Sequence, residues 1–387
     1  MKTALHVVAK ALEGQRIAYH FINETALYIQ GALSSPPKQL SVEVQWDVFD
    51  AACQLFNSSP PETRKNERKA SCSVEVEGTS VQISCLFQTT VRTHPQRIQL
   101  ASDGERVWCL SLYAYLGDQT LAPIVQQHLN DLQNDVTQTN QHVWNRDQYT
   151  ALVERHGAPN KMAQKLKKHP AWRLHPFKDH LEPINGSSIL HLMGSSGVKG
   201  VALSMLGAKV TIVDFSEENA AYAKALAEEA GVHLDYIVTD VLRLPEEPHN
   251  HYDRVVLELG VLHYFVNLQP LMNVVAQMLA NGGRFVLHEF HPVSTKLITS
   301  TGKMRTVDGN YFDPTINEQV PASSKHLPED KRDKLPRVFQ RKWTLGEIVT
   351  AVAKAGLTID VLSEEPNHKM NDIGLPKTFT LVATKPA

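Results

Sequence analysis

Small and acidic residues follow three consecutive predicted strands, at points where a ligand could bind. The segment 193–197, Met-Gly-Ser-Ser-Gly, joins a strand to a helix, Asp214 ends the next strand, and Asp240 ends the third. In an open α/β sheet, the carboxyl ends of the parallel strands form the edge at which ligands bind. We therefore expect these three positions to lie side by side in one ligand site.

The spacing of the glycines restricts the ligand. Gly194, Gly197 and Gly200 stand three residues apart. This matches neither a phosphate loop, which needs Gly-Lys-Ser/Thr, nor the G-x-G-x-x-G turn of dinucleotide sites. Asp214 can accept hydrogen bonds from both hydroxyls of a ribose, and Asp240 can accept one from the amine of adenine. S-adenosylmethionine, an adenosine without phosphate, fits this pattern; a purely structural turn is the alternative.

The elements that must position these residues begin near residue 188. Strands and helices alternate from there, which predicts a parallel sheet with helices on both faces. The last two strands are joined without a helix, so we expect them to pair antiparallel at one end of the sheet. A capping box formed by Thr344 and Glu347 is predicted to start the last helix. The expected strands cover residues 187–192, 209–215, 234–240, 252–260, 283–290, 357–365 and 377–385.

The first third of the chain has a different pattern, typical of an α+β domain. Alternating strands flank Gly78 and the pair Asp103-Gly104, which predicts two hairpins. A further strand is expected to carry Val42, Val44 and Trp46 on one face. The predicted division is an α+β domain at 1–125, a helical connector and cofactor lid at 126–180, and an α/β domain at 181–387 with a substrate cap at about 293–343.

Several motifs of the second half resemble one known family. They are "ILHLMGSSG" from residue 189, "ALSMLGAKVTIVDFS" from residue 202, "LANGGRFVLHEFHP" from residue 279 and the closing "LPKTFTLVATKP". In this order they resemble the class I S-adenosylmethionine-dependent methyltransferases, a resemblance that covers about residues 140–387. It implies a Rossmann-like, seven-stranded, mostly parallel sheet with an antiparallel C-terminal hairpin.

The glycine loop departs from the D-x-G-x-G-x-G pattern of that family. His191 replaces the acid, and Met193 and Ser195 replace two glycines. The loop therefore carries side chains where most relatives have none. A degenerate domain that binds no cofactor is the alternative interpretation.

The resemblance also implies roles for individual residues. Asp214 should hold the ribose, and Asp240 and Val241 should bracket the adenine. The chemistry of methyl transfer, and not the resemblance, adds that the acceptor can need a base for its proton, and the side chains that could supply one follow the fourth and fifth strands. Glu289 is expected on the opposite sheet face from His288. The cofactor-binding candidates are Tyr149, Met193, Gly194, Ser195, Gly197, Asp214, Phe215, Asp240, Val241, Glu258 and Leu259, and the catalytic candidates are His263, Glu289 and His291. The alternatives for His263 and His291 are a packed lid residue and a turn residue.

The first domain faintly resembles the minimal nucleotidyltransferase fold. Where that family carries a strand with two metal-binding acids, this chain has Ser41-Val42-Glu43. Because Ser41 stands where that family has an acid, a catalytic site with two metal ions would lack one of its carboxylate ligands. We expect a catalytically dead relative that serves substrate recognition or dimer contacts, and no metal site in the chain.

Composition limits the partners. Lys and Arg number 39 and Asp and Glu 41, a net charge of −2, which argues against nonspecific binding to nucleic acid or membranes. No apolar run is long enough to cross a bilayer. The basic segment 161–178 is expected to be a solvated helix, although contact with RNA is the alternative. Four cysteines without metal-ligand spacing predict reduced thiols and a cytoplasmic location.

These observations predict an enzyme that transfers a methyl group from S-adenosylmethionine to an N, O or S atom of a small molecule. The N-terminal domain is expected to assist recognition or form a homodimer. Two other functions stay open: a methyltransferase that modifies RNA, and a sensor that binds the cofactor without turnover.

Overall fold

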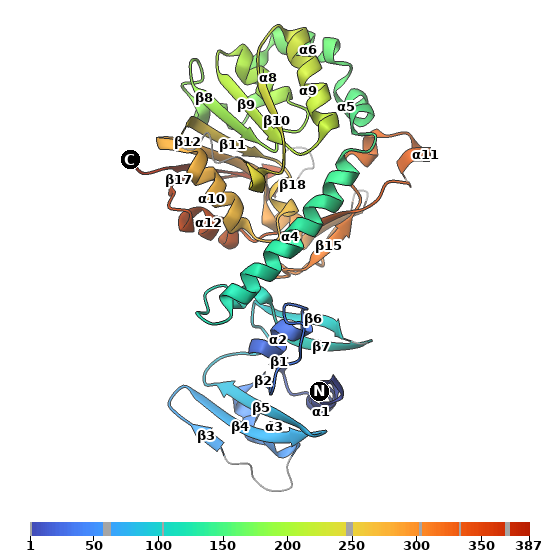
Figure 1. Cartoon of the computed structure of the whole chain (residues 1–387), viewed down its shortest axis with the longest axis vertical. Helices are drawn as coiled ribbons and strands as arrows, with labels where there is room; N and C mark the ends of the chain where they lie inside the picture. Colours follow the sequence, from blue (N-terminus) through green and yellow to red (C-terminus); the bar gives the residue numbers. More distant parts are fainter. Residues whose placement is uncertain are drawn as a thin grey trace. The chain divides into compact units, whose positions relative to one another are not determined.

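The computed structural model describes residues 2–56, 63–102, 104–244, 251–301, 304–332, 334–367 and 372–387. The chain forms two compact units (Figure 1). The N-terminal unit contains residues 1–131 and 312–314, and the C-terminal unit contains residues 132–311 and 315–387. No helix among the described residues is long and apolar enough to cross a membrane.

The N-terminal unit is a mixed sheet with helices. Its seven strands have the order β3-β4-β5-β2-β1-β7-β6. Its elements are α1 (Lys2–Gly14), β1 (Tyr19–Phe21), α2 (Asn23–Ile29), β2 (Leu40–Val44), η1 (Trp46–Val48), α3 (Phe49–Gln54), β3 (Thr63–Lys65), β4 (Lys69–Val76), β5 (Thr79–Leu86), β6 (Arg97–Ser102), β7 (Glu105–Leu110) and η2 (Leu112–Tyr115).

Both hairpins expected in this unit are present. β4 and β5 pair antiparallel around Glu77 and Gly78, which both have a positive φ, as a tight hairpin turn requires. β6 and β7 also pair antiparallel, although Asp103 of their turn lies outside the described residues. One strand prediction was too long: β2 ends at Val44, and Trp46 begins a 3₁₀ turn with 42% of its surface exposed. Alternation alone did not reveal that the core ends there.

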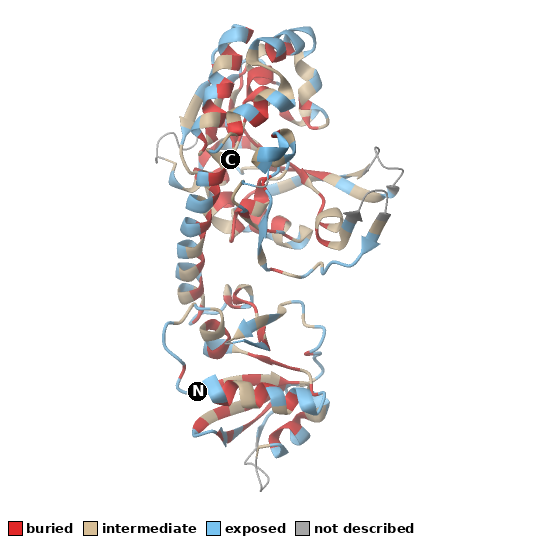
Figure 2. Ribbon diagram, turned by 90° about the vertical axis from the view of Figure 1, so that its right-hand side faces the viewer, coloured by how far each residue is buried: buried red, intermediate tan, exposed pale blue. Residues whose placement is uncertain are grey.

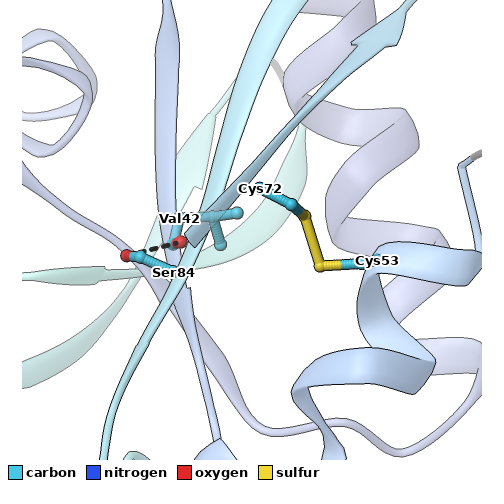
Figure 3. Close-up of a disulfide and its surroundings, with 4 residues drawn as sticks. All are labelled: Val42, Cys53, Cys72 and Ser84. Carbon is cyan, nitrogen blue, oxygen red and sulfur yellow. Dashed lines mark hydrogen bonds between the residues drawn. A yellow bond between two sulfur atoms is a disulfide. The ribbon is translucent and has the colours of Figure 1, made fainter. Parts of the chain in front are cut away.

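A disulfide joins two of the four cysteines, so the prediction of reduced thiols was wrong for this pair (Figure 3). Cys53 on α3 and Cys72 on β4 are 19 residues apart in sequence, and their Cα atoms lie 6.8 Å from each other. The helix packs across the sheet face on which Cys72 lies, a contact that the sequence spacing does not reveal. Cys85 and Cys109 are free and buried. The cytoplasmic location rested on reduced thiols and loses that support, because disulfides persist mainly in oxidising compartments.

The C-terminal unit is built on a second seven-stranded sheet, with the order β10-β9-β8-β11-β12-β18-β17. The pairs among β8 to β12 are parallel, whereas β18 runs antiparallel to both β12 and β17. This confirms the Rossmann-like sheet and its antiparallel C-terminal hairpin. The strands are β8 (Ser188–Leu192), β9 (Lys209–Asp214), β10 (Asp235–Val238), β11 (Tyr252–Glu258), β12 (Leu279–Phe290), β17 (Thr358–Asn367) and β18 (Asp372–Thr384).

Helices cover both faces of this sheet, and the buried residues follow the strands (Figure 2). On one face, α10 and α12 pack on the apolar side chains of β11 and β12; on the other, α5, α6, α8 and α9 pack on β8 and β9. The helices are α4 (Ala122–Trp144), which begins in the N-terminal unit, α5 (Gln148–His156), α6 (Pro159–Lys168), η3 (Pro170–Leu174), α7 (Lys178–Leu181), α8 (Val198–Met205), α9 (Glu217–Ala230), η4 (Val241–Arg243), η5 (Leu262–Tyr264), α10 (Leu268–Met278) and α12 (Leu345–Lys354).

Local signals set the ends of these helices. The Ser216 hydroxyl accepts a hydrogen bond from the Asn219 N–H and begins α9, and the Thr344–Glu347 capping box begins α12. Both starts were expected from the sequence. The insertion before α12 adds η6 (Val293–Leu297), β13 (Ile298–Thr301), β14 (Met304–Val307), β15 (Ile316–Gln319), η7 (Ser324–His326), α11 (Glu329–Arg332) and β16 (Val338–Arg341).

Candidate cofactor and methyl-transfer site

The loop after β8 has the backbone conformation of a glycine-rich loop, although two of its glycine positions carry side chains. Met193 has φ of +51° and Ser195 has φ of +47°, both in the left-handed region that favours glycine. A Cβ atom on Gly194 would lie 2.7 Å from the Ile212 side chain, and one on Gly197 would lie 2.5 Å from the Ala223 Cβ. The loop is therefore pressed against β9 and α9, and two of its side chains stand in a strained backbone.

Asp214 holds this loop to the start of α9. One carboxylate oxygen accepts a hydrogen bond from the Ser195 N–H at 3.1 Å, and the other accepts from the Ser216 N–H at 2.9 Å and the Asn219 amide at 3.1 Å. Burial raises the pKa of Asp214, although these hydrogen bonds oppose the shift. The carboxylate thus organises the edge of the sheet before any ligand arrives.

A cavity lies at the carboxyl ends of β8, β9 and β10, as the sequence predicted. Apolar and aromatic side chains form part of its wall, and Asp214 and Asp240 contribute carboxylates. Burial raises the pKa of Asp240 as well. The lining residues are Gln133, Thr137, Asn140, Met193, Asp214, Phe215, Thr239, Asp240, Val241, Tyr264 and Phe265.

One wall of the cavity comes from α4, which lies in the predicted helical connector and cofactor lid, but its lining residues were not among the predicted site residues. Gln133 donates a hydrogen bond to the Tyr264 carbonyl at 3.1 Å and accepts one from the Val266 N–H at 2.7 Å. Asn140 donates to the Phe339 carbonyl at 3.0 Å and accepts from the Phe339 N–H at 2.8 Å. The spacing of Gln133, Thr137 and Asn140 places them on one helix face and was the available signal.

A half-buried ion pair lies beside the loop on the α8 side of the sheet. Lys199 of α8 pairs with Glu258 at the end of β11, and the His191 Nε2 lies 3.4 Å from the other Glu258 oxygen. Burial lowers the pKa of Lys199 to about 7 and that of His191 to about 3, so His191 is neutral at pH 7. Lys199 was not among the predicted site residues, because nothing in the local sequence joins it to Glu258.

The other cofactor candidates lie in different surroundings. Met193, Phe215 and Val241 line the cavity, whereas Tyr149 on α5 packs against Tyr222, with ring centroids 5.8 Å apart. Leu259 follows β11 and is exposed, with φ of +36°.

Glu289 is a loop clamp in this structure. Its carboxylate is buried and accepts hydrogen bonds from four backbone N–H groups, at 2.5 Å from Gly260, 2.7 Å from Phe290, 3.0 Å from Val261 and 3.3 Å from Leu262. It thereby fixes the turn that leads into His263. Burial is the largest effect on Glu289 and raises its pKa.

The two candidate histidines differ in their partners. Burial lowers the pKa of His263 to about 4, so its ring is neutral at pH 7 and is a weaker base than a free imidazole. The His291 Nδ1 accepts a hydrogen bond from the Val293 N–H at 3.1 Å, and its Nε2 lies 2.7 Å from Glu364. Both nitrogens of His291 thus face protein groups. His288, on the opposite sheet face, lies 3.0 Å from the Thr380 hydroxyl.

The residues around the cavity fit an adenosine-containing cofactor. Two carboxylates suit the hydroxyls of a ribose and the amine of adenine, and the apolar side chains suit a flat ring. Residues 193–287 match a methyltransferase domain family. The chain contains a class I methyltransferase domain. Such a domain uses S-adenosylmethionine as the methyl donor, and the cavity lies within the matched region and α4.

Curated relatives of the methyltransferase domain include two ubiquinone biosynthesis O-methyltransferases. That of Paramagnetospirillum magneticum is 26% identical over 121 residues, 31% of this chain and 47% of the relative. That of Xanthomonas axonopodis pv. citri is 27% identical over 149 residues, 38% of this chain and 62% of the relative. The chain therefore spans about half to three fifths of these relatives.

Among solved structures, an S-adenosylmethionine-dependent methyltransferase from Mesorhizobium loti is similar. It is 21% identical, covers 57% of this chain and 100% of its own length, and has a TM-score of 0.44.

Proposed function

We propose that the methyltransferase domain transfers a methyl group to a small-molecule acceptor, with a hydroxyl oxygen as the favoured acceptor atom. The observation that carries this proposal is the cavity beside the glycine loop, with Asp214 and Asp240 in its wall. The oxygen is favoured because the curated relatives are named O-methyltransferases.

In this proposal, the domain holds the cofactor through its own charged groups. Asp214 binds the ribose and Asp240 the adenine amine, while Phe215 and Val241 pack against the base. When bound, S-adenosylmethionine supplies a methyl group on a sulfonium that a nucleophile displaces. The protein contributes orientation and excludes water, which accounts for much of the acceleration of such a displacement.

The amino-acid end of the cofactor suits the pair of Lys199 and Glu258. A zwitterion carries one carboxylate and one ammonium group, and this half-buried pair carries the opposite charges close to the loop, although neither residue lines the cavity itself. We therefore assign Lys199 to the carboxylate and Glu258 to the ammonium group.

His263 is the proposed base for the acceptor's proton. It is neutral at pH 7 and follows the clamped turn at the ligand edge. Glu289 positions this turn through the N–H groups of Gly260 and Val261. For His291 we propose a positioning role at the turn after β12, because its two nitrogens face Val293 and Glu364.

For the N-terminal unit we propose a noncatalytic role in acceptor recognition or in forming a homodimer. Glu43 of β2 lies beside His20 of β1, with 3.7 Å between the Glu43 oxygen and the His20 Nε2. Within the described residues, no group of three or more His, Cys, Asp or Glu side chains could hold a metal ion. No nucleotidyl transfer is expected with Mg²⁺ and nucleoside triphosphates, and labelled product that disappears in Glu43→Ala would overturn this proposal.

Cofactor binding is tested by titration calorimetry with S-adenosylhomocysteine. Wild type should bind it, and Asp214→Ala should bind about 10- to 100-fold more weakly, since a hydrogen bond to a charged group contributes roughly 1.5–3 kcal/mol. Asp235→Ala is the matched control, because Asp235 is exposed at the opposite end of β10. Equal affinities in all three proteins would refute the assignment of Asp214.

The charged pair is tested by comparing two ligands. Methylthioadenosine lacks the amino-acid end of S-adenosylhomocysteine. Lys199→Met should weaken the binding of S-adenosylhomocysteine on the order of tenfold and leave that of methylthioadenosine unchanged. An equal loss for both ligands would instead indicate that Lys199 only supports the fold.

The acceptor is sought by screening phenols, amines and thiols with labelled S-adenosylmethionine. With the acceptor found, His263→Ala should slow methyl transfer on the order of 10²- to 10⁴-fold, and cofactor affinity should not change. If His263→Ala and His291→Ala both keep the wild-type rate, transfer occurs through orientation alone.

A further inference from the structure

One segment of the chain is strongly basic, although the chain as a whole is nearly neutral. Residues 155–178 contain seven Lys and Arg residues and no Asp or Glu, in a chain whose net charge is −2. This segment covers the end of α5, all of α6 and η3. Its surplus of positive charge is therefore concentrated on one part of the C-terminal unit.

Helix α6 presents this charge to solvent. Met162, Ala163 and Leu166 are buried, and the helix packs beside α9 (Figure 1). Lys165 and Lys168 are exposed. Because residues three or four apart share a helix face, the lysines form a continuous basic stripe with Lys161 on the opposite side from the core.

Two arginines lie near the inner side of α6, because Arg173 donates a hydrogen bond to the sulfur of the buried Met162 and both guanidinium charges lower the pKa of Lys199 on α8. Arg155 and Arg173 lie close enough that the charge of Arg155, after burial, lowers the pKa of Arg173. Among the described residues, neither forms an ion pair with a carboxylate within 4.0 Å. Their positive charges add to the electrostatic potential of the lysine stripe, which attracts phosphate groups.

An exposed aromatic ring completes the surface. Trp172 in η3 has 62% of its surface exposed, which is unusual for so large an apolar side chain. The Arg173 guanidinium lies 4.5 Å from the centre of its ring. An exposed ring beside phosphate-binding cations is the arrangement on which unpaired bases stack.

A membrane surface fits these residues less well. A helix that lies on a membrane buries an apolar face in the lipid. The apolar face of α6, with Met162 and Leu166, is already buried against the domain. Only Trp172 would remain to enter the lipid.

We propose that Arg155, α6 and η3 form a docking surface for single-stranded RNA. Lys161, Lys165 and Lys168 contact phosphates, Arg155 and Arg173 add positive charge behind them, and Trp172 stacks on a base. Single-stranded RNA is the occupant because unpaired bases are accessible for stacking, and RNA-binding proteins recognise such bases with aromatic and Arg side chains. This proposal is independent of the proposed function, since the surface needs neither the cofactor nor the acceptor.

The test measures fluorescence anisotropy of a short labelled oligouridylate, without cofactor and over a range of salt concentrations. Lys165→Glu/Lys168→Glu should weaken binding at least tenfold and reduce the salt slope by about 1.4, from two phosphate contacts at roughly 0.7 each. Trp172→Ala should weaken binding about 5- to 100-fold, the value of one stacked base. Lys354→Glu, an exposed lysine on α12, is the matched control and should bind as wild type does.

Three outcomes would overturn the proposal. The first is that wild type does not bind the oligouridylate at low salt. The second is that Lys354→Glu weakens binding as much as the double variant, or that Trp172→Ala has no effect, either of which would indicate only nonspecific attraction of a polyanion. The third is that vesicles containing phosphatidylglycerol bind the protein and displace the RNA, whereas Trp172→Ala abolishes vesicle binding alone. Circular dichroism melting verifies that each variant is folded.

Discussion

Replacing Glu289 by Gln tests whether one carboxylate holds the turn after β11. The Gln side chain has the same shape, but one of its two polar atoms is a donor. If its oxygen faces Gly260 and Phe290, its NH₂ group faces the N–H groups of Val261 and Leu262, and two hydrogen bonds are lost. At roughly 1.5–3 kcal/mol for each bond to a charged group, the loss is about 3–6 kcal/mol.

Removing the buried charge offsets part of this loss, because burial disfavours the ionised form of Glu289. We therefore expect the free energy of unfolding to fall by about 2–4 kcal/mol, and the melting temperature to fall by about 4–16 °C for a domain of this size. The assay is circular dichroism melting, with hydrogen exchange of residues 260–262 as a local readout. Glu318→Gln, an exposed residue of β15, is the control. A melting temperature within 2 °C of wild type, with unchanged exchange, would refute the clamp.

Three further predictions concern stability. Ser195→Gly should raise the free energy of unfolding by about 0.5–1 kcal/mol in a urea titration, because it relieves a positive φ of +47°; a decrease would mean that the hydroxyl contributes more than the strain costs. Reduction of the Cys53–Cys72 disulfide, or Cys53→Ser, should lower the stability of the N-terminal unit by about 3 kcal/mol, as for a loop of this length; an unchanged melting curve with dithiothreitol would contradict this. Burial lowers the pKa of His20 to about 3, so its neutral form is favoured in the fold. The stability that depends on neutral His20 is present above pH 6.5 and is lost as the pH falls from 6.5 towards 3. When the free energy of unfolding is measured as the pH is lowered, it should fall less steeply for His20→Leu than for wild type. Equal slopes for the two proteins would refute the assignment.

The sequence predicted those features that leave a local signal. Alternation of strands and helices predicted the parallel sheet, and the acids at the strand ends, Asp214 and Asp240, predicted where the cavity lies. Contacts between distant segments leave no such signal. Asn140 is hydrogen-bonded to Phe339, which lies 199 residues further along the chain. Glu258 at the end of β11 pairs with Lys199 on α8, the helix that follows a different strand, β8.

The role of a residue is harder to predict than its position. Glu289 was expected among the catalytic residues, and its position at the end of β12 is as expected. Yet all four of its hydrogen bonds are to backbone N–H groups, and such a partner set depends on how the neighbouring turn folds. Residue type and strand position cannot distinguish a base from a clamp.

The amide side chains of α4 have a consequence for how fast a ligand can enter the cavity. Moving this wall away would break the four hydrogen bonds that Gln133 and Asn140 make with backbone groups. At roughly 1 kcal/mol each, these four bonds alone would hold the open form to about one molecule in a thousand or fewer, and the bond from Gln141 to the Phe215 carbonyl lowers that fraction further. If entry requires that form, association should be slower than diffusion by a similar factor, and its observed rate should level off as ligand concentration rises. Gln133→Ala would then speed up both entry and release, with a smaller change in affinity than in either rate.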